Sequence, residues 1–556
     1  MTAVAASAGA GATGTDPGGT AAGAPARRLS STRAGTWALM RFFARLDRVR
    51  IAVWIVGTAL LVLSSAVSID ELYPTQADLT AAAEPLYDNA AVIALQGPTY
   101  AIDTLGGQIV FNLGGFGYVV MGLMAMFLVG RHTRGDEEQG RLELLRATVV
   151  GRDAPVTAAL GVASAALVVV GVLITLSMLS LDLPLTGSVS YGVAMASFGV
   201  LFAAVTAVAA QVTEHTRAAY GMTGAALGAS FVIRAVGDVS DGTLSWLSPM
   251  GWAQGMKPYA GERWWPLLLL VGATAGLVAL TFALLARRDL GSGLVAPRPG
   301  PPVAAPSLTR PWGLSLRLQR SSIVGWASGL ALTGVAYGSL GEDVADIIGD
   351  NDQIAEIITQ AGGSITDSYF SSSLLMLAVI AGGFTVSSAL RLRGEESAGR
   401  AEPLLATAVA RPRWVLSHLA VTLAGGLAIL AAAGLGMGIT YGIIAGDAGE
   451  VPRLTGAALA FAPPLWLLAG VVTALFGLAP RAGAAAWALL GWSAVVAFLG
   501  ELLDLPQWAR DVSPFEHVPR VPVDSVAWPP LIVLTLLAAG LTAAGVAGFR
   551  CRDAGA

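Results

Sequence analysis

Long apolar runs restrict the fold of this chain more than any other feature. A helix needs roughly 20 mostly apolar residues to cross the hydrocarbon core of a bilayer, and about twelve segments have that character. The predicted spans are 51–69, 106–130, 155–181, 189–212, 217–236, 264–286, 322–341, 371–390, 414–445, 453–479, 482–503 and 528–549. Only 13% of the residues are charged, about half the share of a soluble protein. The sequence predicts an all-α polytopic membrane protein with about twelve transmembrane helices.

Basic residues are concentrated in alternate connections between these spans. Lys and Arg accumulate in cytoplasmic loops, and a cytoplasmic N-terminus places 27 of the 33 on that side. The loops 70–105 and 342–370 would then lie outside; they contain no basic residue and carry 6 and 7 acids respectively. We therefore expect both termini inside the cell.

Composition divides the chain into four regions. Residues 1–36 are rich in Ala, Gly, Ser and Thr, so we expect a disordered cytoplasmic tail without a signal peptide. Two six-helix halves, 37–286 and 321–550, flank a proline-rich cytoplasmic linker, 287–320. The first half opens with Trp37–Arg50, where aromatic residues alternate with Arg as in an interfacial helix. The two halves are expected to form a parallel repeat.

A charged segment of nineteen residues occurs once in each half. Arg134–Arg152 (RGDEEQGRLELLRATVVGR) aligns without a gap with Arg393–Arg411 (RGEESAGRAEPLLATAVAR), 259 positions later, and 11 of the 19 positions are identical. Each copy follows the second span of its half. Three acids are retained in both, at 136/395, 137/396 and 143/402. A loop that only fixed topology would need arginine alone, so this pattern indicates a contact site.

Each copy also has the periodicity of an amphipathic helix. The spacing predicts one apolar stripe per copy, formed by Leu142, Leu145, Val149 and Val150, and by Ala401, Leu404, Leu405, Ala408 and Val409. Glu137 stands four residues before Arg141, and Glu396 four before Arg400, so each is expected to form a helical ion pair. Pro403 interrupts the second copy, which predicts that its helix starts there with proline in the first turn.

This segment resembles the E-x-x-G-R/T-x-E-x-L-x-A/S-T motif of ABC-2-type exporter permeases, and it has the same place after the second helix. Two fused six-helix units are similar to the actinobacterial antibiotic permeases of the tetronasin-resistance type. The resemblance implies a bacterial cell-membrane protein whose segments are coupling helices that dock on a cytoplasmic ATPase. The docking residues would be Glu137, Glu138, Gly140, Arg141 and Glu143 in one copy, and Glu395, Glu396, Gly399, Arg400 and Glu402 in the other. It also implies short helices at 237–263 and 504–527, on the outside.

The energy source is expected in another chain. A P-loop needs a lysine that reaches the phosphates, and the single lysine, Lys257, lacks that context. We expect no bound cofactor and no metal; ATP and Mg²⁺ would belong to a separate ABC ATPase, present in two copies. The other partners are the lipid bilayer and a hydrophobic or amphipathic cargo such as an antibiotic, a polyketide or a lipid-like compound. Nucleic acid is not an expected partner.

Five residues are candidates for the cargo path. Gln108 and Asn112 lie four residues apart in the second span, where polar groups face a cavity or pair with another helix. Arg234 ends the fifth span and either reaches the outer interface or pairs with Asp238. The eleventh span contributes Trp487 and Trp492.

Two other classes of function share part of this pattern. A proton-coupled major facilitator carrier also has six plus six helices, and Gly135, Gly140 and Arg141 partly resemble its loop motif. A membrane glycosyltransferase would use an acidic pair such as Asp70 and Glu71 outside the first span. Its match after the seventh span, Glu342 and Asp343, indicates a repeated structural feature instead.

Overall fold

The computed structural model describes residues 32–87, 89–148, 150–288, 291, 293–295, 300, 302–341, 364–500 and 505–552. Most of the predicted tail 1–36, eight residues of the linker 287–320 and the greater part of the loop 342–370 lie outside these residues. Within them the chain is helical and contains no strand, as predicted.

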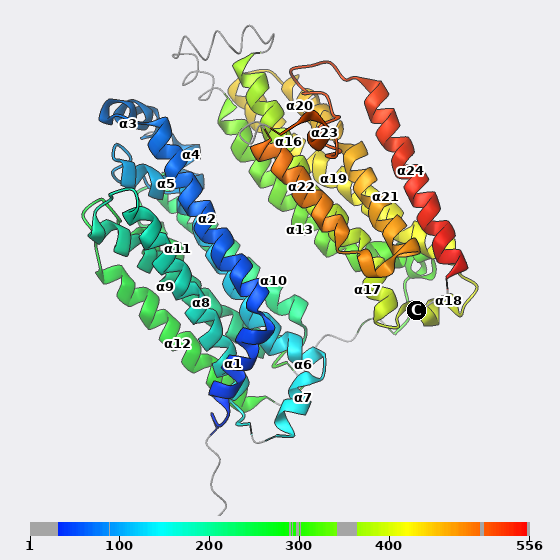
Figure 1. Cartoon of the computed structure of the whole chain (residues 1–556), viewed down its shortest axis with the longest axis horizontal. Coiled ribbons are helices and arrows are strands. Elements are labelled where there is room, and N and C mark those ends of the chain that lie inside the picture. Colours follow the sequence, from blue (N-terminus) through cyan, green and yellow to red (C-terminus); the bar gives the residue numbers. More distant parts are fainter. Residues whose placement is uncertain are drawn as a thin grey trace, which may run out of the picture. The chain divides into compact units, whose positions relative to one another are not determined.

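Ten helices in the described part are long and apolar enough to cross a membrane. They are α2 (Arg48–Leu72), α5 (Leu105–Gly130), α8 (Ala154–Leu179), α9 (Leu185–Val212), α10 (Thr216–Val239), α12 (Trp265–Arg287), α16 (Ile365–Ala389), α19 (Arg411–Ile444), α20 with α21 (Glu450–Leu459 and Ala462–Leu478) and α24 (Trp528–Cys551). Figure 1 shows them as long rods.

The other two predicted spans correspond to α13 (Pro311–Ser339) and α22 (Ala485–Leu499). α13 is 29 residues long, but its first turns carry Arg317 and Arg320. The described part of α22 is 15 residues long. The polytopic all-α class is therefore confirmed, whereas the total of twelve spans and the topology stay predictions.

Short helices occupy the connections. They are α1 (Thr36–Leu46), α3 (Gln76–Ala83), η1 (Glu84–Leu86), α4 (Ala90–Gln96), η2 (Arg131–Gly135), α6 (Asp136–Glu138), α7 (Arg141–Arg146), η3 (Leu244–Leu247), α11 (Pro249–Gln254), η4 (Pro306–Thr309), α17 (Arg391–Ser397), α18 (Ala401–Leu405), η5 (Pro480–Ala482) and α23 (Gln507–Arg510). The interfacial segment predicted at Trp37–Arg50 is thus helical, as α1 and the start of α2. Short helices also form at 237–263 and 504–527, as expected.

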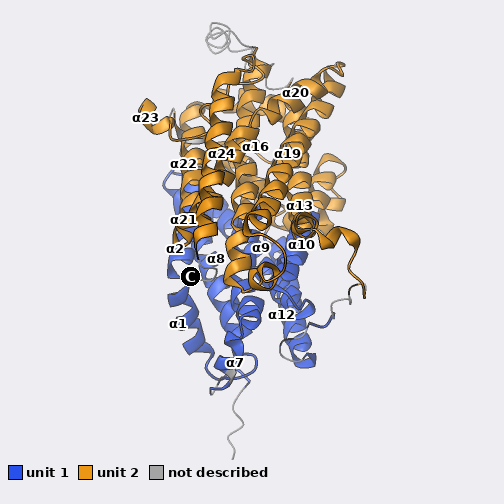
Figure 2. Ribbon diagram, turned by 90° about the vertical axis from the view of Figure 1, so that its right-hand side faces the viewer, with its two compact units in different colours: residues 1–63, 118–229, 264–296 blue, residues 64–117, 230–263, 297–556 orange. Residues whose placement is uncertain are grey.

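The chain forms two compact units (Figure 2). The first comprises residues 1–63, 118–229 and 264–296, in which α8 packs against α9, α9 against α12, and α1 against α8. Glycine allows the close approach of α8 and α9, because a Cβ on Gly171 would lie 2.6 Å from the carbonyl oxygen of Gly192. Such small-residue contacts are typical of helix packing in membranes.

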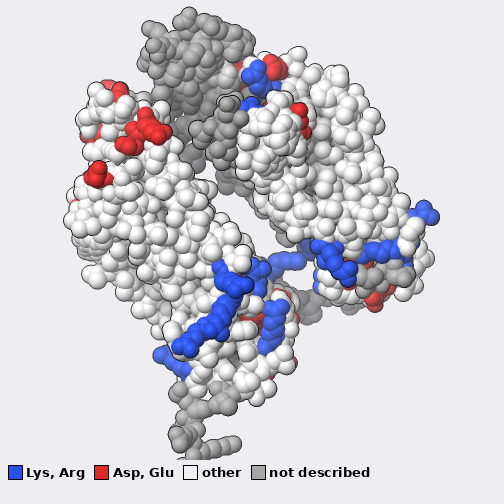
Figure 3. Space-filling view, in the orientation of Figure 1, with Lys and Arg blue, Asp and Glu red and all other residues white. Residues whose placement is uncertain are grey.

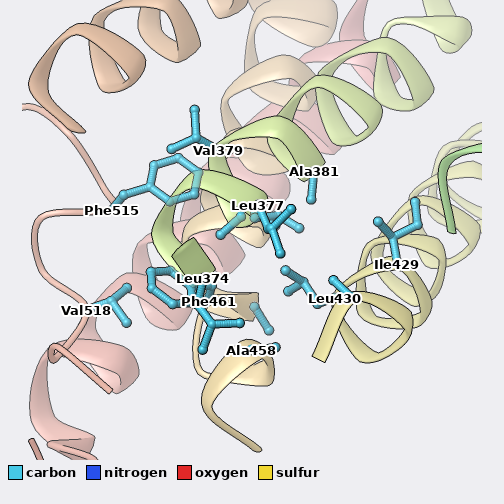
Figure 4. Packing of buried hydrophobic residues seen from close by; sticks show 14 of the residues in the cluster. Leu374, Leu377, Val379, Ala381, Ile429, Leu430, Ala458, Phe461, Phe515 and Val518 are labelled. Carbon is cyan, nitrogen blue, oxygen red and sulfur yellow. The ribbon is translucent and has the colours of Figure 1, made fainter. Parts of the chain in front are cut away.

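The second unit comprises residues 64–117, 230–263 and 297–556. Here α13 packs along α19 and α21 along α24, and Gly477 meets the backbone of Gly545 where the latter pair is closest. Its core brings aromatic and branched side chains of α16, α19, α21 and the 515–518 loop together, among them Leu377, Phe461 and Phe515 (Figure 4).

Candidate coupling segments

Each duplicated segment consists of the charged end of a long helix, a glycine and a short second helix. In the first copy η2 and α6 precede α7, and in the second α17 precedes α18. Gly140 and Gly399 adopt φ of 69° and 68°, a left-handed conformation that glycine tolerates and other residues rarely adopt. The helices α7 and α18 end at Arg146 and Leu405, so they are shorter than the predicted stripes. Pro403 lies in the first turn of α18, as predicted.

The glycine break changes the local ion pairs. Arg141 binds Asp136 at 3.1 Å and Arg400 binds Glu395 at 2.8 Å, so each arginine contacts the acid five residues earlier. We expected the acid four residues earlier, at Glu137 and Glu396, as in a continuous helix. The left-handed glycine turns the chain between acid and arginine, and that expectation was wrong by one residue. The hydrogen bond to Glu395 raises the pKa of the Arg400 guanidinium above its ordinary value.

Glu137 instead forms a buried ion pair with an arginine beyond the last helix of the first half. Its carboxylate accepts from both terminal nitrogens of Arg288 at 2.8 Å and from the backbone N–H of Gly291 at 2.8 Å. Arg134 adds a third charged donor at 3.0 Å. Both Glu137 and Arg288 are 6% exposed, so this carboxylate faces the protein interior.

Glu396 makes the corresponding contact in the second copy. Nη2 of Arg552 lies 2.8 Å from both oxygens of Glu396, and both side chains are largely buried. The guanidinium of Arg552 also lies over the rings of Phe476 and Phe549. Sequence reasoning missed Arg288 and Arg552. The available signal was their shared position, since each is the second or third residue after the last predicted span of its half.

The far end of each segment binds the same helix terminus. Arg152, the last residue of the first copy, donates to the carbonyl oxygens of Leu285 and Arg288. Arg411 ends the second copy and donates to the carbonyl of Arg552 at 2.6 Å. A cation at the C-terminus of a helix satisfies carbonyls that have no partner within the helix, and it interacts favourably with the helix dipole.

The apolar stripes pack into small cores. Leu145 and Val150 contact the cluster that contains Leu39 and Phe43 of α1. In the second copy, Leu404, Leu405 and Val409 pack against a cluster that includes Ala401, Trp414 and Phe549. Leu142 and Ala401 are buried and the other packed members are half-buried, whereas Ala408 is exposed and Val149 lies outside the described residues. Each predicted stripe is therefore covered over most of its described length, although it extends past the end of α7 or α18.

The opposite side of each segment is exposed and nearly the same in both copies. We define the docking face as Arg141, Glu143, Leu144, Ala147 and Thr148 in the first copy, and as Arg400, Glu402, Pro403, Ala406 and Thr407 in the second. All ten residues are exposed, and four of the five positions are identical. In each unit Lys and Arg side chains gather around these segments (Figure 3).

The first copy has additional polar contacts. His132 lies between Asp47 and Asp136, at 2.6 Å and 3.2 Å, and stacks on Phe43. Asp47 separates α1 from α2, so this cluster joins α1 to the segment. Arg391 stands in the place of His132 in the second copy, and pairs with Glu395.

Glu138 extends these contacts to the start of α10. Its carboxylate accepts from the backbone N–H of Thr216 at 3.2 Å and lies 3.1 Å from Nδ1 of His215. The corresponding residue in the second copy is Ser397, which carries no charge. Glu138 is therefore engaged within the chain, although it is partly exposed.

The candidate path residues have different surroundings. Gln108 is buried whereas Asn112, four residues on, is exposed. Trp492 donates from its indole nitrogen to the carbonyl of Ala509 at 2.9 Å and thereby fixes the segment after α22. Trp487 is 46% exposed.

Arg234 has a structural environment. Its side chain is fully buried and pairs with Asp238 at 3.4 Å, which confirms one of the two alternatives stated for it. It also donates to the carbonyls of Ile93 and Leu95 and lies over the ring of Phe231. The guanidinium therefore connects α10 to the end of α4.

The fold is that of a multi-pass α-helical membrane protein. The chain is similar to the multidrug efflux system permease protein Rv1217c of Mycobacterium tuberculosis (strain ATCC 25618 / H37Rv), with 40% identity over 536 residues that cover 96% of this chain and 97% of the relative. Residues 308–550 match the family described as multidrug efflux system permease Rv1217c, C-terminal domain. The chain therefore belongs to this family of multidrug efflux permeases and is a multi-pass protein of the bacterial cell membrane.

Proposed function

We propose that this chain is the membrane subunit of an ATP-driven ABC-2-type exporter, and that a separate ABC ATPase binds its two docking faces. The observation that carries the proposal is the pair of exposed faces, which keep Arg, Glu, Ala and Thr at matching positions. On the side away from each docking face, a buried ion pair (Glu137–Arg288 or Glu396–Arg552) fixes the conformation of the segment. Two faces correspond to two ATPase subunits per permease, with ATP and Mg²⁺ on those subunits.

The proposed cargo is a hydrophobic or amphipathic compound, such as an antibiotic, that leaves the cell. The relative's name describes multidrug efflux, and this chain is similar to it over almost its full length. The alternative power source, a proton gradient, would make the docking faces unnecessary. An uncoupler that stopped efflux while cellular ATP persisted would favour that alternative.

Affinity purification tests the docking faces directly. The tagged permease is purified from the membrane of its host, and we expect an ABC-type ATPase to co-purify at two copies per permease. The double variant Glu143→Lys with Glu402→Lys reverses one exposed charge on each face and should abolish co-purification. Both carboxylates are exposed, so folding should be unaffected.

The matched control is Asp524→Lys, which reverses an exposed acid in the segment before α24. This variant should retain the ATPase, whereas equal retention by the Glu143 and Glu402 double variant would contradict the proposed docking role.

A further inference from the structure

We propose that the pairs Glu137–Arg288 and Glu396–Arg552 are positioning residues that carry movement of the docking faces into α12 and α24. The inference rests on the proposed function, because the movement would come from the ATPase. We call each pair, together with the arginine at the end of its segment, a clasp.

Each clasp attaches its segment to the helix terminus at two points. Glu137 binds the side chain of Arg288, and Arg152, fifteen positions further on, binds the backbone carbonyl of the same residue at 3.0 Å. Glu396 and Arg411 hold Arg552 in the same two ways. Two attachments fix both the position and the direction of the segment. It cannot slide along the helix end unless a buried ion pair breaks.

The attached helices are suited to transmit a displacement. α12 has 23 residues and is therefore about 35 Å long at the usual rise per residue. Only 11% of its most apolar window is buried, and 22% of that of α24. Each packs mainly along one neighbour, α9 or α21. Most of the surface of each helix lies outside the core, and Leu531 and Phe549 are the residues of α24 that belong to buried clusters. A rigid helix of this kind, held at its end, can shift while few core contacts change.

The other ends of these helices join the segments that contain α11 and α23. α12 begins at Trp265 and α24 at Trp528, directly after residues 249–263 and 505–527. A shift at Arg288 or Arg552 would therefore reach those segments through a single helix. This is a direct mechanical route from each docking face along one helix to the segment that precedes that helix in the chain.

Stability alone gives a weaker account of the clasps. Buried ion pairs are often no more stabilising than apolar residues of similar size, yet an acid and an arginine meet in both copies. The two arginines lie 264 positions apart and the two glutamates 259, so the contact is kept although the intervening lengths differ. We infer that both halves retain the Glu–Arg ion pair itself, although the number of residues between the glutamate and the arginine differs.

Charge reversal distinguishes a role in transmitting movement to α12 or α24 from a role in binding the ATPase. The variants are Glu137→Arg, Arg288→Glu and their combination, made in the full-length permease with the ATPase that the wild type captures. The second clasp is treated in the same way. The measurements are co-purified ATPase, ATP hydrolysis, efflux of a lipophilic cationic dye from cells, and hydrogen exchange of the purified permease. The control is Glu84→Arg, which reverses one exposed charge in η1, and it should change none of them.

We expect each single reversal to keep the ATPase and its hydrolysis but to lower dye efflux by about tenfold, within the usual range of coupling between sites. At the first clasp the combination should restore part of the efflux, because Arg134 remains beside position 137. Unchanged efflux in the single variants would overturn the inference. A parallel loss of efflux and captured ATPase would also overturn it, because the pair would then only hold the docking face in place.

Hydrogen exchange distinguishes failure of the inference from failure of the proposed function. A wild type that captures no ATPase contradicts the proposed function. The clasp then remains testable, since a broken clasp should speed exchange in the segment and at the end of α12 together. Faster exchange in the segment alone would show that the two are not linked. If a reversed variant does not reach the membrane, Glu137→Gln and Arg288→Gln replace it under the same criteria.

Discussion

A left-handed glycine sets the conformation of each coupling segment. No atom lies within 4 Å of a Cβ built on Gly399, so a substitution there meets only backbone strain. That strain is about 1–2 kcal/mol for a residue other than glycine. We therefore expect Gly399→Ala to destabilise the segment by about this amount, and Gly140→Ala to do the same.

Gly394 provides the matched control in the same segment. It lies in α17 with open space around it and without a positive φ. Gly394→Ala should be neutral or slightly stabilising, because alanine favours a helix more than glycine does. Hydrogen exchange over residues 393–411 measures both variants. Equal protection in the two would show that the left-handed turn is not required.

At the residue scale, the ion-pair partners of Glu137 and Glu396 could not be predicted from the sequence. The spacing of Glu137 and Arg141 predicted a local pair, but the partner of Glu137 is Arg288, 151 residues away. Only the packing of α12 brings the two together. Glu137 and Glu396 are consequently turned inward, and Glu143 and Glu402 are the acids that test docking. Gly140 and Gly399 were named as docking residues, which stays a prediction, and their left-handed φ was not predicted.

At the scale of elements, the apolar runs predicted the helices well because hydrocarbon thickness sets their length. α5, α9 and α12 lie within a few residues of the predicted spans. The short helices α7 and α18 were predicted less well, since their ends depend on a glycine and on contacts with α1 and α24. The predicted stripe is covered at most of its described positions but not at Ala408, and its helical extent was predicted too long.

The connection between α10 and α4 gives a prediction at this scale. Arg234 is fully buried between Asp238 and the carbonyls of Ile93 and Leu95. Arg234→Met would leave the Asp238 carboxylate without its cation, and breaking a buried pair costs about 3–5 kcal/mol. We expect a lower midpoint of thermal unfolding for the purified permease.

Neutralising the remaining partner tests the cause. The double variant Arg234→Met with Asp238→Asn should recover part of the loss, because the isolated charge is gone. Ser245 would keep a hydrogen-bond partner at position 238. A double variant as unstable as the single one would show that the carbonyl contacts, and not the ion pair, hold α10 to α4.

For the whole molecule, the repeated segments predicted two equivalent contact sites, yet the structure shows that they differ in detail. The first is joined to α1 through His132 and Asp47 and to α10 through Glu138. The second has Arg391 and Ser397 at the matching positions. These differences arise from single substitutions, His132 to Arg391 and Glu138 to Ser397. The residues that His132 and Glu138 contact, such as Asp47 and Thr216, lie outside the two aligned segments.

The two docking faces should therefore hold the ATPase unequally. Leu144 is 74% exposed on the first face, and Pro403 replaces it on the second. Burying a leucine in a partner's groove contributes about 1.5–3 kcal/mol, more than the smaller proline ring can supply.

Glu402→Lys, which leaves the first face intact, should retain one ATPase per permease through washing. Glu143→Lys leaves only the second face intact, and this variant should lose its ATPase during washing. Native mass spectrometry counts the subunits, and Leu144→Pro with Pro403→Leu should exchange the two behaviours. If both single variants retained the ATPase equally, this side chain would not set the strength of docking, and the identical Arg, Glu, Ala and Thr would account for it at both faces.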